Sequence, residues 1–217
     1  MMSRMPEPVR LLLVRHGEQV RTGDDGPLTE RGERQVRLLA AALALGPDDL
    51  LVASPLRRAR QTAAAFARPA RVYDDLCEFR FGPTWAWEQA DRREDLALWR
   101  PQDRVAGGES LAEFQTRIDA ALAELAGTGA PRIVVCVHSG VIDAALRWAF
   151  GATAGTPWTT EAELPHASVT ELWHWPTGRH PRGAPRHTLL VRLGDVGYLP
   201  AELVTDGPPP LPPVPLR

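Results

Sequence analysis

A histidine that follows a short apolar run is the first candidate for chemistry in this sequence. Residues 9–14 are almost wholly apolar, and Arg15, His16 and Gly17 follow them directly. A neutral imidazole can act as a nucleophile, and the neighbouring guanidinium can hold an anion. Glycine lets the backbone turn and leaves room for a ligand. An isolated His-Gly pair is more often an ordinary turn, so its function depends on what accompanies it.

A second histidine, His138, occupies the equivalent position after another apolar run. Residues 133–137 are all apolar, and His138 comes next. Short runs of this kind are typical of strands buried on both faces of a parallel sheet. Ligands collect where the carboxyl ends of such strands meet. We therefore expect His16 and His138 to lie close together at one edge of a sheet.

A cluster of basic residues supplies a candidate anion-binding group. A short apolar strand precedes Ser54 and Pro55, which favour a helix start with the serine as N-cap. Arg58 would then lie near the first turn, where free backbone N–H groups and the helix dipole also attract negative charge. The other arginines of this helix are more simply explained by a solvated face.

Strands and helices alternate along most of the chain. Expected strands cover residues 9–14, 50–53, 133–137, 169–175 and 188–193, and expected helices cover residues 29–45, 54–66, 111–127 and 141–150. Thr29 is a suitable N-cap, and Ser110 with Glu113 has the spacing of a capping box. The alternation predicts a three-layer α/β/α fold with a mostly parallel central sheet.

The length of 217 residues suits a single domain, which we expect over residues 1–206. Residues 73–108 lack clear periodicity and are interpreted as a partly helical insertion that could cover a site. This insertion contains Trp85, Trp87 and Trp99. Residues 207–217 are dominated by proline and are expected to be extended and disordered, although such a tail could also dock in a partner's groove.

Composition and charge argue against several classes of partner. The formal net charge is -2, and the chain contains arginine but no lysine. It therefore lacks the cationic field expected of a protein that binds nucleic acid or an anionic membrane. Cys77 and Cys136 have no metal-type spacing and are interpreted as reduced thiols. With neither a secretory leader nor an apolar segment of about 20 residues evident, we expect a cytoplasmic protein.

Several blocks of sequence, taken in order, resemble a known family. They cover residues 13–18, 28–32 with Gln35, 54–63, 76–82, 108–110 and 135–141. The chain is similar in these blocks to the histidine phosphatase superfamily, branch 1, also called phosphoglycerate mutase-like. The resemblance implies the phosphoglycerate mutase-like α/β fold. It also implies a phosphomonoester hydrolase of histidine acid phosphatase type, acting on small metabolites without a cofactor.

Carried over position by position, the resemblance implies a phosphohistidine mechanism. His16 would be the nucleophile that becomes phosphorylated, and Arg15, Arg58 and His138 would hold the transferring phosphoryl group. Glu78 would donate a proton to the leaving oxygen and later activate water. From the residues alone, Glu78 could also be a surface carboxylate paired with a nearby arginine.

The chemistry of these side chains is consistent with that mechanism. Guanidinium groups stay protonated and bind phosphate oxygens in pairs, and phosphoryl transfer depends mainly on positioning and charge stabilisation. His16 must attack as neutral imidazole, so we expect its other ring nitrogen to donate to a fixed acceptor such as a backbone carbonyl. Partial burial of Glu78 would raise its pKa and keep it protonated.

Three departures from the family pattern concern contacts with the substrate. Thr22 stands where many members have asparagine, and Ser139 replaces the more usual glycine after the second histidine. Residues 83–85 also differ from the usual continuation. Thr22 and Ser139 are candidate substrate-binding residues, and the identity of the small phosphorylated substrate stays open. The chain could act as a monomer or as a homodimer.

Other functions fit the sequence less well. A phosphoglycerate-type mutase would return the phosphoryl group to a sugar acid, but the resemblance implies that such enzymes are usually longer. A catalytically idle member would bind a phosphorylated ligand or a protein, yet it could have lost any of the catalytic side chains. A serine hydrolase would need a Gly-x-Ser-x-Gly motif around Ser139. His174, His180 and His187 fit no metal-binding helix face, so no metal is expected.

Overall fold

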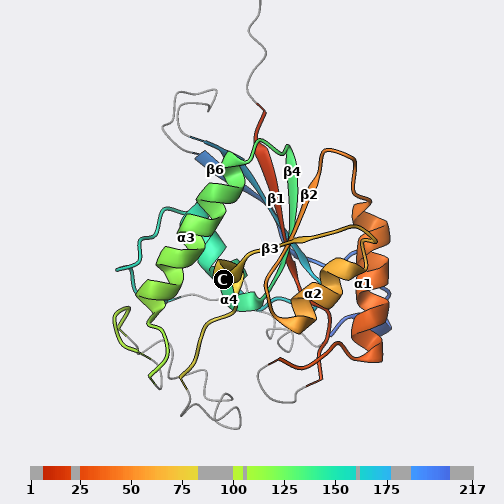
Figure 1. Cartoon of the computed structure of the whole chain (residues 1–217), viewed down its shortest axis with the longest axis horizontal. Helices are drawn as coiled ribbons and strands as arrows, with labels where there is room; N and C mark the ends of the chain where they lie inside the picture. The colour runs from red at the N-terminus through yellow and green to blue at the C-terminus, as the bar shows by residue number, and fades with distance from the viewer. Residues whose placement is uncertain are drawn as a thin grey trace, which may run out of the picture.

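A mixed six-stranded sheet forms the centre of the molecule, with the strand order β3-β2-β4-β1-β5-β6 (Figure 1). The computed structural model describes residues 7–20, 25–82, 100–104, 107–159, 162–176 and 187–205. The strands are β1 (Val9–Arg15), β2 (Leu50–Ala53), β3 (Arg71–Val72), β4 (Arg132–Val137), β5 (Val169–Trp175) and β6 (His187–Asp195). Strands β1 to β4 run parallel, whereas β5 is antiparallel to both β1 and β6. Because β6 then points the same way as β1, the sheet is mostly parallel, as predicted.

Helices cover both faces of this sheet. α1 (Glu30–Leu43) and α2 (Arg57–Ala64) lie on one face, and α3 (Leu111–Gly127) and α4 (Ser139–Ala149) lie on the other (Figure 1). The short 3-10 helix η1 (Asp74–Leu76) follows β3, and the 3-10 helix η4 (Ala201–Leu203) follows β6. These layers confirm the predicted three-layer α/β/α fold.

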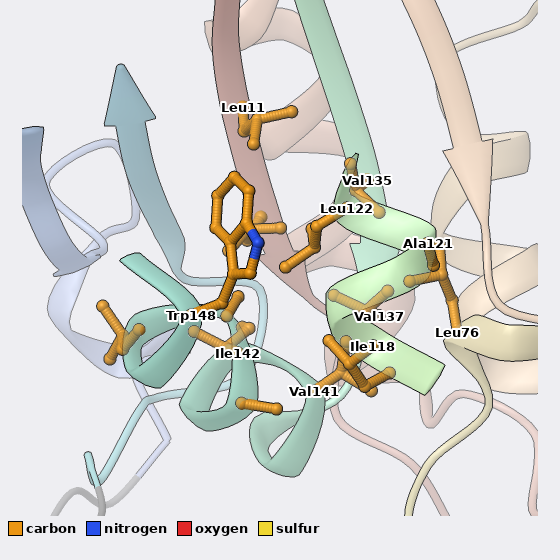
Figure 2. Close-up of a cluster of buried hydrophobic side chains, with 14 of the residues drawn as sticks. Leu11, Leu76, Ile118, Ala121, Leu122, Val135, Val137, Val141, Ile142 and Trp148 are labelled. Carbon is orange, nitrogen blue, oxygen red and sulfur yellow. The ribbon is translucent and has the colours of Figure 1, made fainter. Parts of the chain in front are cut away.

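Alternate side chains of the central strands enter two hydrophobic cores. Leu11 and Leu13 of β1 belong to the cluster that α3 and α4 cover, which Figure 2 shows around Trp148. Leu12 and Val14 belong to the cluster that includes residues of α1 and α2. Because successive side chains of a strand point to opposite faces, a strand between two helical layers is apolar throughout. This is why continuous apolar runs predicted β1 and β4.

The N-caps predicted for α1 and α3 are both confirmed. The Thr29 side chain accepts a hydrogen bond from Gly32 N at 3.0 Å. Ser110 and Glu113 form a complete capping box at the start of α3. The apolar side chains of one face of α3 are also buried, and they are Leu111, Phe114, Ile118, Leu122 and Leu125.

The start predicted for α2 is wrong. The helix begins at Arg57 with Leu56 as its N-cap, so Ser54 lies outside it. The Ser54 hydroxyl lies 2.7 Å from Nε2 of His138 instead. Asp25 accepts a hydrogen bond from Arg57 N at 2.7 Å, so a carboxylate from another loop satisfies this free amide. Ser54 Oγ still accepts a hydrogen bond from Leu56 N at 3.4 Å, but a tertiary partner binds the first amide of the helix.

The connection after α2 is only partly within the described residues. The two-residue strand β3 was not predicted, and η1 accounts for part of the helix expected in residues 73–108. The predictions for Trp85, Trp87 and Trp99 lie outside the described residues, as do those for the proline-rich tail, residues 207–217. None of the helices in the described ranges combines the length and the apolar character needed to cross a membrane.

Candidate active site

Side chains from several segments meet at the carboxyl edge of the parallel strands. His16 follows β1, Ser54 follows β2 and His138 follows β4. His166 precedes β5, and because β5 runs the opposite way, its start lies at the same edge. The ring centroid of His16 lies 5.3 Å from that of His138 and 5.5 Å from that of His166. The structure therefore brings the two predicted histidines together and adds a third.

His16 is buried, with only 4% of its surface exposed, and its ring has a defined orientation. Nδ1 lies 2.8 Å from Gly17 O, and because a carbonyl only accepts, Nδ1 must carry the proton. The free lone pair is therefore on Nε2. Burial, and then the neighbouring His138 and Arg58, lower the pKa of His16 well below its ordinary value. The ring is accordingly neutral near pH 7.

The glycine after the histidine is required by close packing. A Cβ on Gly17 would lie 2.8 Å from Gly32 O and 2.8 Å from Val36 Cγ1. Gly17 N donates to Thr62 Oγ1 at 3.1 Å, and the same hydroxyl donates to Arg58 O at 2.8 Å. The turn is thus tied directly to the helix that carries Arg58.

Arg58, His138 and Ser54 form a buried row of hydrogen bonds. Arg58 Nε donates to His138 Nδ1 at 3.2 Å, and His138 Nε2 lies 2.7 Å from Ser54 Oγ. Since an arginine can only donate, His138 Nδ1 accepts, and the neutral ring carries its proton on Nε2. Burial, followed by the charges of Arg58 and Arg15, lowers the pKa of His138 well below its ordinary value. In this arrangement His138 orients the guanidinium of Arg58.

Arg15 is held by the segment that leads into β5. Its Nη1 donates to Leu164 O, and its Nη2 lies 3.3 Å from His166 Nε2. His166 Nδ1 lies 3.3 Å from Thr205 Oγ1, so both nitrogens of this ring have partners. Arg15 and Arg58 reach the site from different elements, and the charges of both lower the pKa of His16.

Glu78 lies in the extended segment after η1 and is half-buried. Its Oε1 accepts a hydrogen bond from Phe79 N at 2.9 Å, and its Oε2 accepts one from Gly140 N at 3.2 Å. Gly140 belongs to the first turn of α4, two residues after His138. Loss of hydration raises the pKa of Glu78, although these backbone donors and the charge of Arg58 oppose the shift. The carboxyl group is therefore more readily protonated than an exposed glutamate.

The two predicted substrate-binding residues have different outcomes, and two further residues of the site were not predicted. Ser139 is the first residue of α4, between His138 and Gly140, whereas Thr22 lies outside the described residues. Sequence reasoning missed His166 and the role of Ser54 as partner of His138. His166 could have been found only by recognising that β5 runs antiparallel.

Among the histidines considered as metal ligands, His174 has other partners. His174 Nδ1 lies 2.9 Å from Thr188 Oγ1, and its ring lies 4.6 Å from that of Trp148. His180 lies outside the described residues, and the parts of the chain that the structure describes contain no group of three or more potential metal ligands.

This fold and this set of side chains are typical of a class of proteins in which a histidine acts on phosphoryl groups. The family model of the histidine phosphatase superfamily (branch 1) matches residues 11–182. The chain belongs to this superfamily, whose enzymes include phosphatases and mutases.

Particular relatives of both kinds are similar to this chain. An adenosylcobalamin/alpha-ribazole phosphatase of Salmonella typhimurium is 30% identical over 156 residues, which cover 62% of this chain and 76% of that protein. A probable phosphoglycerate mutase GpmB of Photorhabdus laumondii is 30% identical over 132 residues, covering 52% of this chain and 61% of that protein. The chain thus spans less than two thirds of the GpmB relative's length.

A solved structure of a mycobacterial enzyme is also similar. It is a glucosyl-3-phosphoglycerate phosphatase in complex with inorganic phosphate, and it matches with a TM-score of 0.68 at 25% identity. The match covers 88% of this chain and 100% of that one.

Proposed function

We propose that this protein hydrolyses phosphate monoesters of small metabolites and that His16 carries the phosphoryl group between two steps. The observation that carries the proposal is the state of the His16 ring. It is buried and neutral, and Gly17 O holds its proton on Nδ1, which leaves Nε2 as the nucleophilic atom. A neutral imidazole of this kind is suited to nucleophilic catalysis.

In the first step, Nε2 of His16 attacks phosphorus, a P–N bond forms, and the bond from phosphorus to the leaving oxygen breaks. Glu78 donates its proton to that oxygen, so the product alcohol leaves as a neutral molecule. The raised pKa of Glu78 favours the protonated carboxyl group that this step requires.

In the second step, water attacks the phosphorus of the phosphohistidine while Glu78, now a carboxylate, accepts a proton from that water. The P–N bond breaks, its electron pair returns to Nε2, and inorganic phosphate leaves. One water molecule is consumed, and both side chains regain their starting protonation states. The cycle balances without a cofactor.

The cationic side chains stabilise the charge of the transferring group. Arg15 and Arg58 bind the equatorial oxygens of the phosphoryl group, where negative charge is concentrated in the transition state. His138 helps to hold that group through Arg58, whose guanidinium it keeps in its plane. Thr22 and Ser139 remain our candidates for contacts with the rest of the substrate.

A phosphoglycerate-type mutase is the second candidate, because the GpmB relative matches 52% of this chain. Hydrolysis is favoured because the chain spans 76% of the phosphatase relative and only 61% of the GpmB relative. The two reactions differ in the fate of the phosphoryl group. A mutase would isomerise a phosphorylated sugar acid, respond to a bisphosphorylated primer and release little phosphate.

The finer assignments rest on the same site. We assign the enzyme to the histidine acid phosphatase type and its partners to small phosphorylated molecules, not nucleic acid or membranes. The free thiols of Cys77 and Cys136 fit a cytoplasmic location. The proposed chemistry uses side chains of one chain only, so it is compatible with a monomer or a homodimer.

The test is a screen of phosphorylated metabolites beside a generic aryl phosphate, with release of inorganic phosphate as the readout. The wild-type protein is expected to release phosphate, and His16→Ala is expected to release none above background. A catalytically idle binder would release none in either form. Equal release by the two proteins would rule out His16 as the nucleophile.

A further inference from the structure

A largely buried ion pair between Arg117 and Glu109 lies beside the segment that carries Glu78 and binds its backbone. Arg117 lies on α3, and Glu109 immediately precedes the N-cap of that helix. Arg117 Nε and Nη2 donate to the two carboxylate oxygens of Glu109 at 2.9 and 2.6 Å. The side chains are only 12% and 10% exposed. The pair is therefore a bidentate contact that is largely shielded from water.

The other donors of Arg117 all bind the backbone around Glu78. Nη1 donates to Asp75 O at 2.6 Å and to Cys77 O at 2.7 Å, and Nη2 donates to Glu78 O at 3.0 Å. A guanidinium has five N–H groups, and these three bonds together with the two to Glu109 use all of them.

Glu109 binds the same segment on the other side of Glu78. Its Oε1 accepts a hydrogen bond from Arg80 N at 2.6 Å, and its backbone N donates to Arg80 O at 2.9 Å. The segment is thus fixed by Arg117 before and at residue 78 and by Glu109 after it. Residues 77–82 are neither helix nor strand. The hydrogen bonds from Arg117 and Glu109 therefore take the place of the regular backbone hydrogen bonds of a helix or strand.

Aromatic packing places Arg117 and the segment on the same surface of α3. The guanidinium carbon of Arg117 lies 4.7 Å from the ring centroid of Phe114. The ring of Phe79, next to Glu78, packs edge-on against Phe114 with centroids 5.4 Å apart. The Glu78 carboxyl group is then held between this anchored backbone and Gly140 N.

We propose that Arg117 and Glu109 are positioning residues that set the place of the Glu78 carboxyl group for proton transfer to the leaving oxygen. This inference rests on the proposed function, in which Glu78 is the proton donor. Neither residue needs to touch the substrate. Lysine cannot replace Arg117, because an ammonium has three donors and no planar fork to span a carboxylate and three carbonyls.

The test compares substrates that differ only in how much their leaving group needs a proton. A 2,4-dinitrophenolate leaves readily without protonation, whereas an alkyl alcohol requires a general acid. kcat/KM is measured for 2,4-dinitrophenyl phosphate and for an alkyl phosphate with the wild-type protein, Glu78→Gln, Arg117→Lys and Glu109→Gln. Arg37→Lys is the matched control, because Arg37 forms an exposed ion pair with Glu33 on α1.

We expect Arg117→Lys and Glu109→Gln to lose about tenfold or more in kcat/KM on the alkyl phosphate and about twofold or less on the dinitrophenyl ester. Arg37→Lys should match the wild type on both. Equal losses on the two esters, or no loss on either, would overturn the inference, because a purely structural role does not depend on the leaving group.

The design separates this inference from the proposed function. If Glu78→Gln itself fails to discriminate between the esters, the assignment of Glu78 as proton donor is wrong. If Glu78→Gln discriminates and the folded Arg117→Lys and Glu109→Gln variants do not, only the inference fails. Thermal unfolding confirms that each variant is folded. Should Arg117→Lys not fold, the milder Glu109→Gln decides the outcome alone.

Discussion

Burial displaces the pKa values of His16 and Glu78 toward each other. The pKa of His16 is lowered and that of Glu78 is raised. The proposed first step requires a neutral histidine and a protonated glutamate. An exposed histidine is mostly neutral only at a pH where an exposed glutamate is already deprotonated, so few exposed pairs would have both states at once. Moving the two pKa values together enlarges the fraction that is ready to react.

Glu78→Gln is expected to change the pH dependence as well as the rate. In the wild type, kcat/KM on an alkyl phosphate should fall as pH rises through the raised pKa of Glu78, because the deprotonated carboxyl group cannot donate. Glutamine does not titrate, so the variant should be slower and should lose this alkaline limb. The measurement is a pH profile of kcat/KM, and an unchanged profile would contradict the assigned role.

Arg58→Ala should remove a phosphate ligand and leave His138 without its donor. By analogy with the loss of an oxyanion donor, kcat/KM is expected to fall by a factor that corresponds to about 3 to 4 kcal/mol. Arg57→Ala is the control, since the Arg57 side chain is exposed and one position away on the same helix. Similar activity of the two variants would show that Arg58 does not bind the phosphoryl group.

The sequence predicted that His16 and His138 lie together, but it missed His166 and the contact of Ser54 with His138. His16 and His138 each stand directly after a buried apolar run, which fixes the edge of the sheet where they lie. His166 stands before β5, and its place depends on the direction of that strand, which no local pattern encodes. Glu78 depends on contacts with Arg117 and Gly140, which are distant in sequence.

At the scale of elements, the Glu78 carboxyl group packs against Gly140 in the first turn of α4. A Cβ on Gly140 would lie 2.5 Å from Glu78 Oε1. Gly140→Ala should therefore push the carboxyl group away and lower kcat/KM on an alkyl phosphate by about tenfold or more. Alanine is the better helix former, so the variant should not lose much stability.

Gly127→Ala provides the control for this effect. Gly127 is the last residue of α3, and an added Cβ would have no atom within 4 Å. Its melting temperature and activity should both stay close to those of the wild type. If Gly140→Ala retains full activity while folded, the contact between α4 and the Glu78 carboxyl group is not important for the reaction.

Element boundaries were predictable where the determining contact is local. Thr29 and Ser110 cap helices whose own amides lie within three residues, so the sequence contains the whole motif. The start of α2 is different because Asp25 from another loop binds Arg57 N and Ser54 turns to His138. A two-residue strand such as β3 has too little pattern to be seen at all.

At the scale of the whole molecule, the site should make the fold sensitive to mild acid. The pKa values of His16 and His138 lie below their ordinary value of 6.5 in the folded state. The unfolded chain therefore binds more protons as pH falls below about 6.5, and stability decreases from there toward the folded pKa values. Glu78, with a raised pKa, acts in the opposite direction.

His16→Asn separates the contribution of His16 to this loss of stability from that of His138. The melting temperature of the wild type should fall between pH 7.5 and pH 5.5, and that of His16→Asn should fall less. Thermal unfolding followed by circular dichroism at the two pH values measures the melting temperature of each protein. An equal or steeper loss in the variant would mean that the His16 ring is not held neutral in the folded protein.

The three-layer architecture was predictable because it follows from the alternation of strands and helices from β1 to α4. The alternation of elements does not predict which side chains of distant segments come together in space. Arg15, Arg58, Glu78 and His138 come from four separate stretches, and their spacing is a property of the packed sheet and its two cores.

The central claim is that His16 becomes phosphorylated during turnover, and rapid quenching tests it most directly. The protein is mixed with a reactive aryl phosphate, quenched in alkali, and digested for mass spectrometry under conditions that preserve phosphohistidine. We predict a phosphorylated His16 that disappears at the rate of turnover and is missing in His16→Ala. Steady phosphate release with His16 never phosphorylated would contradict the account.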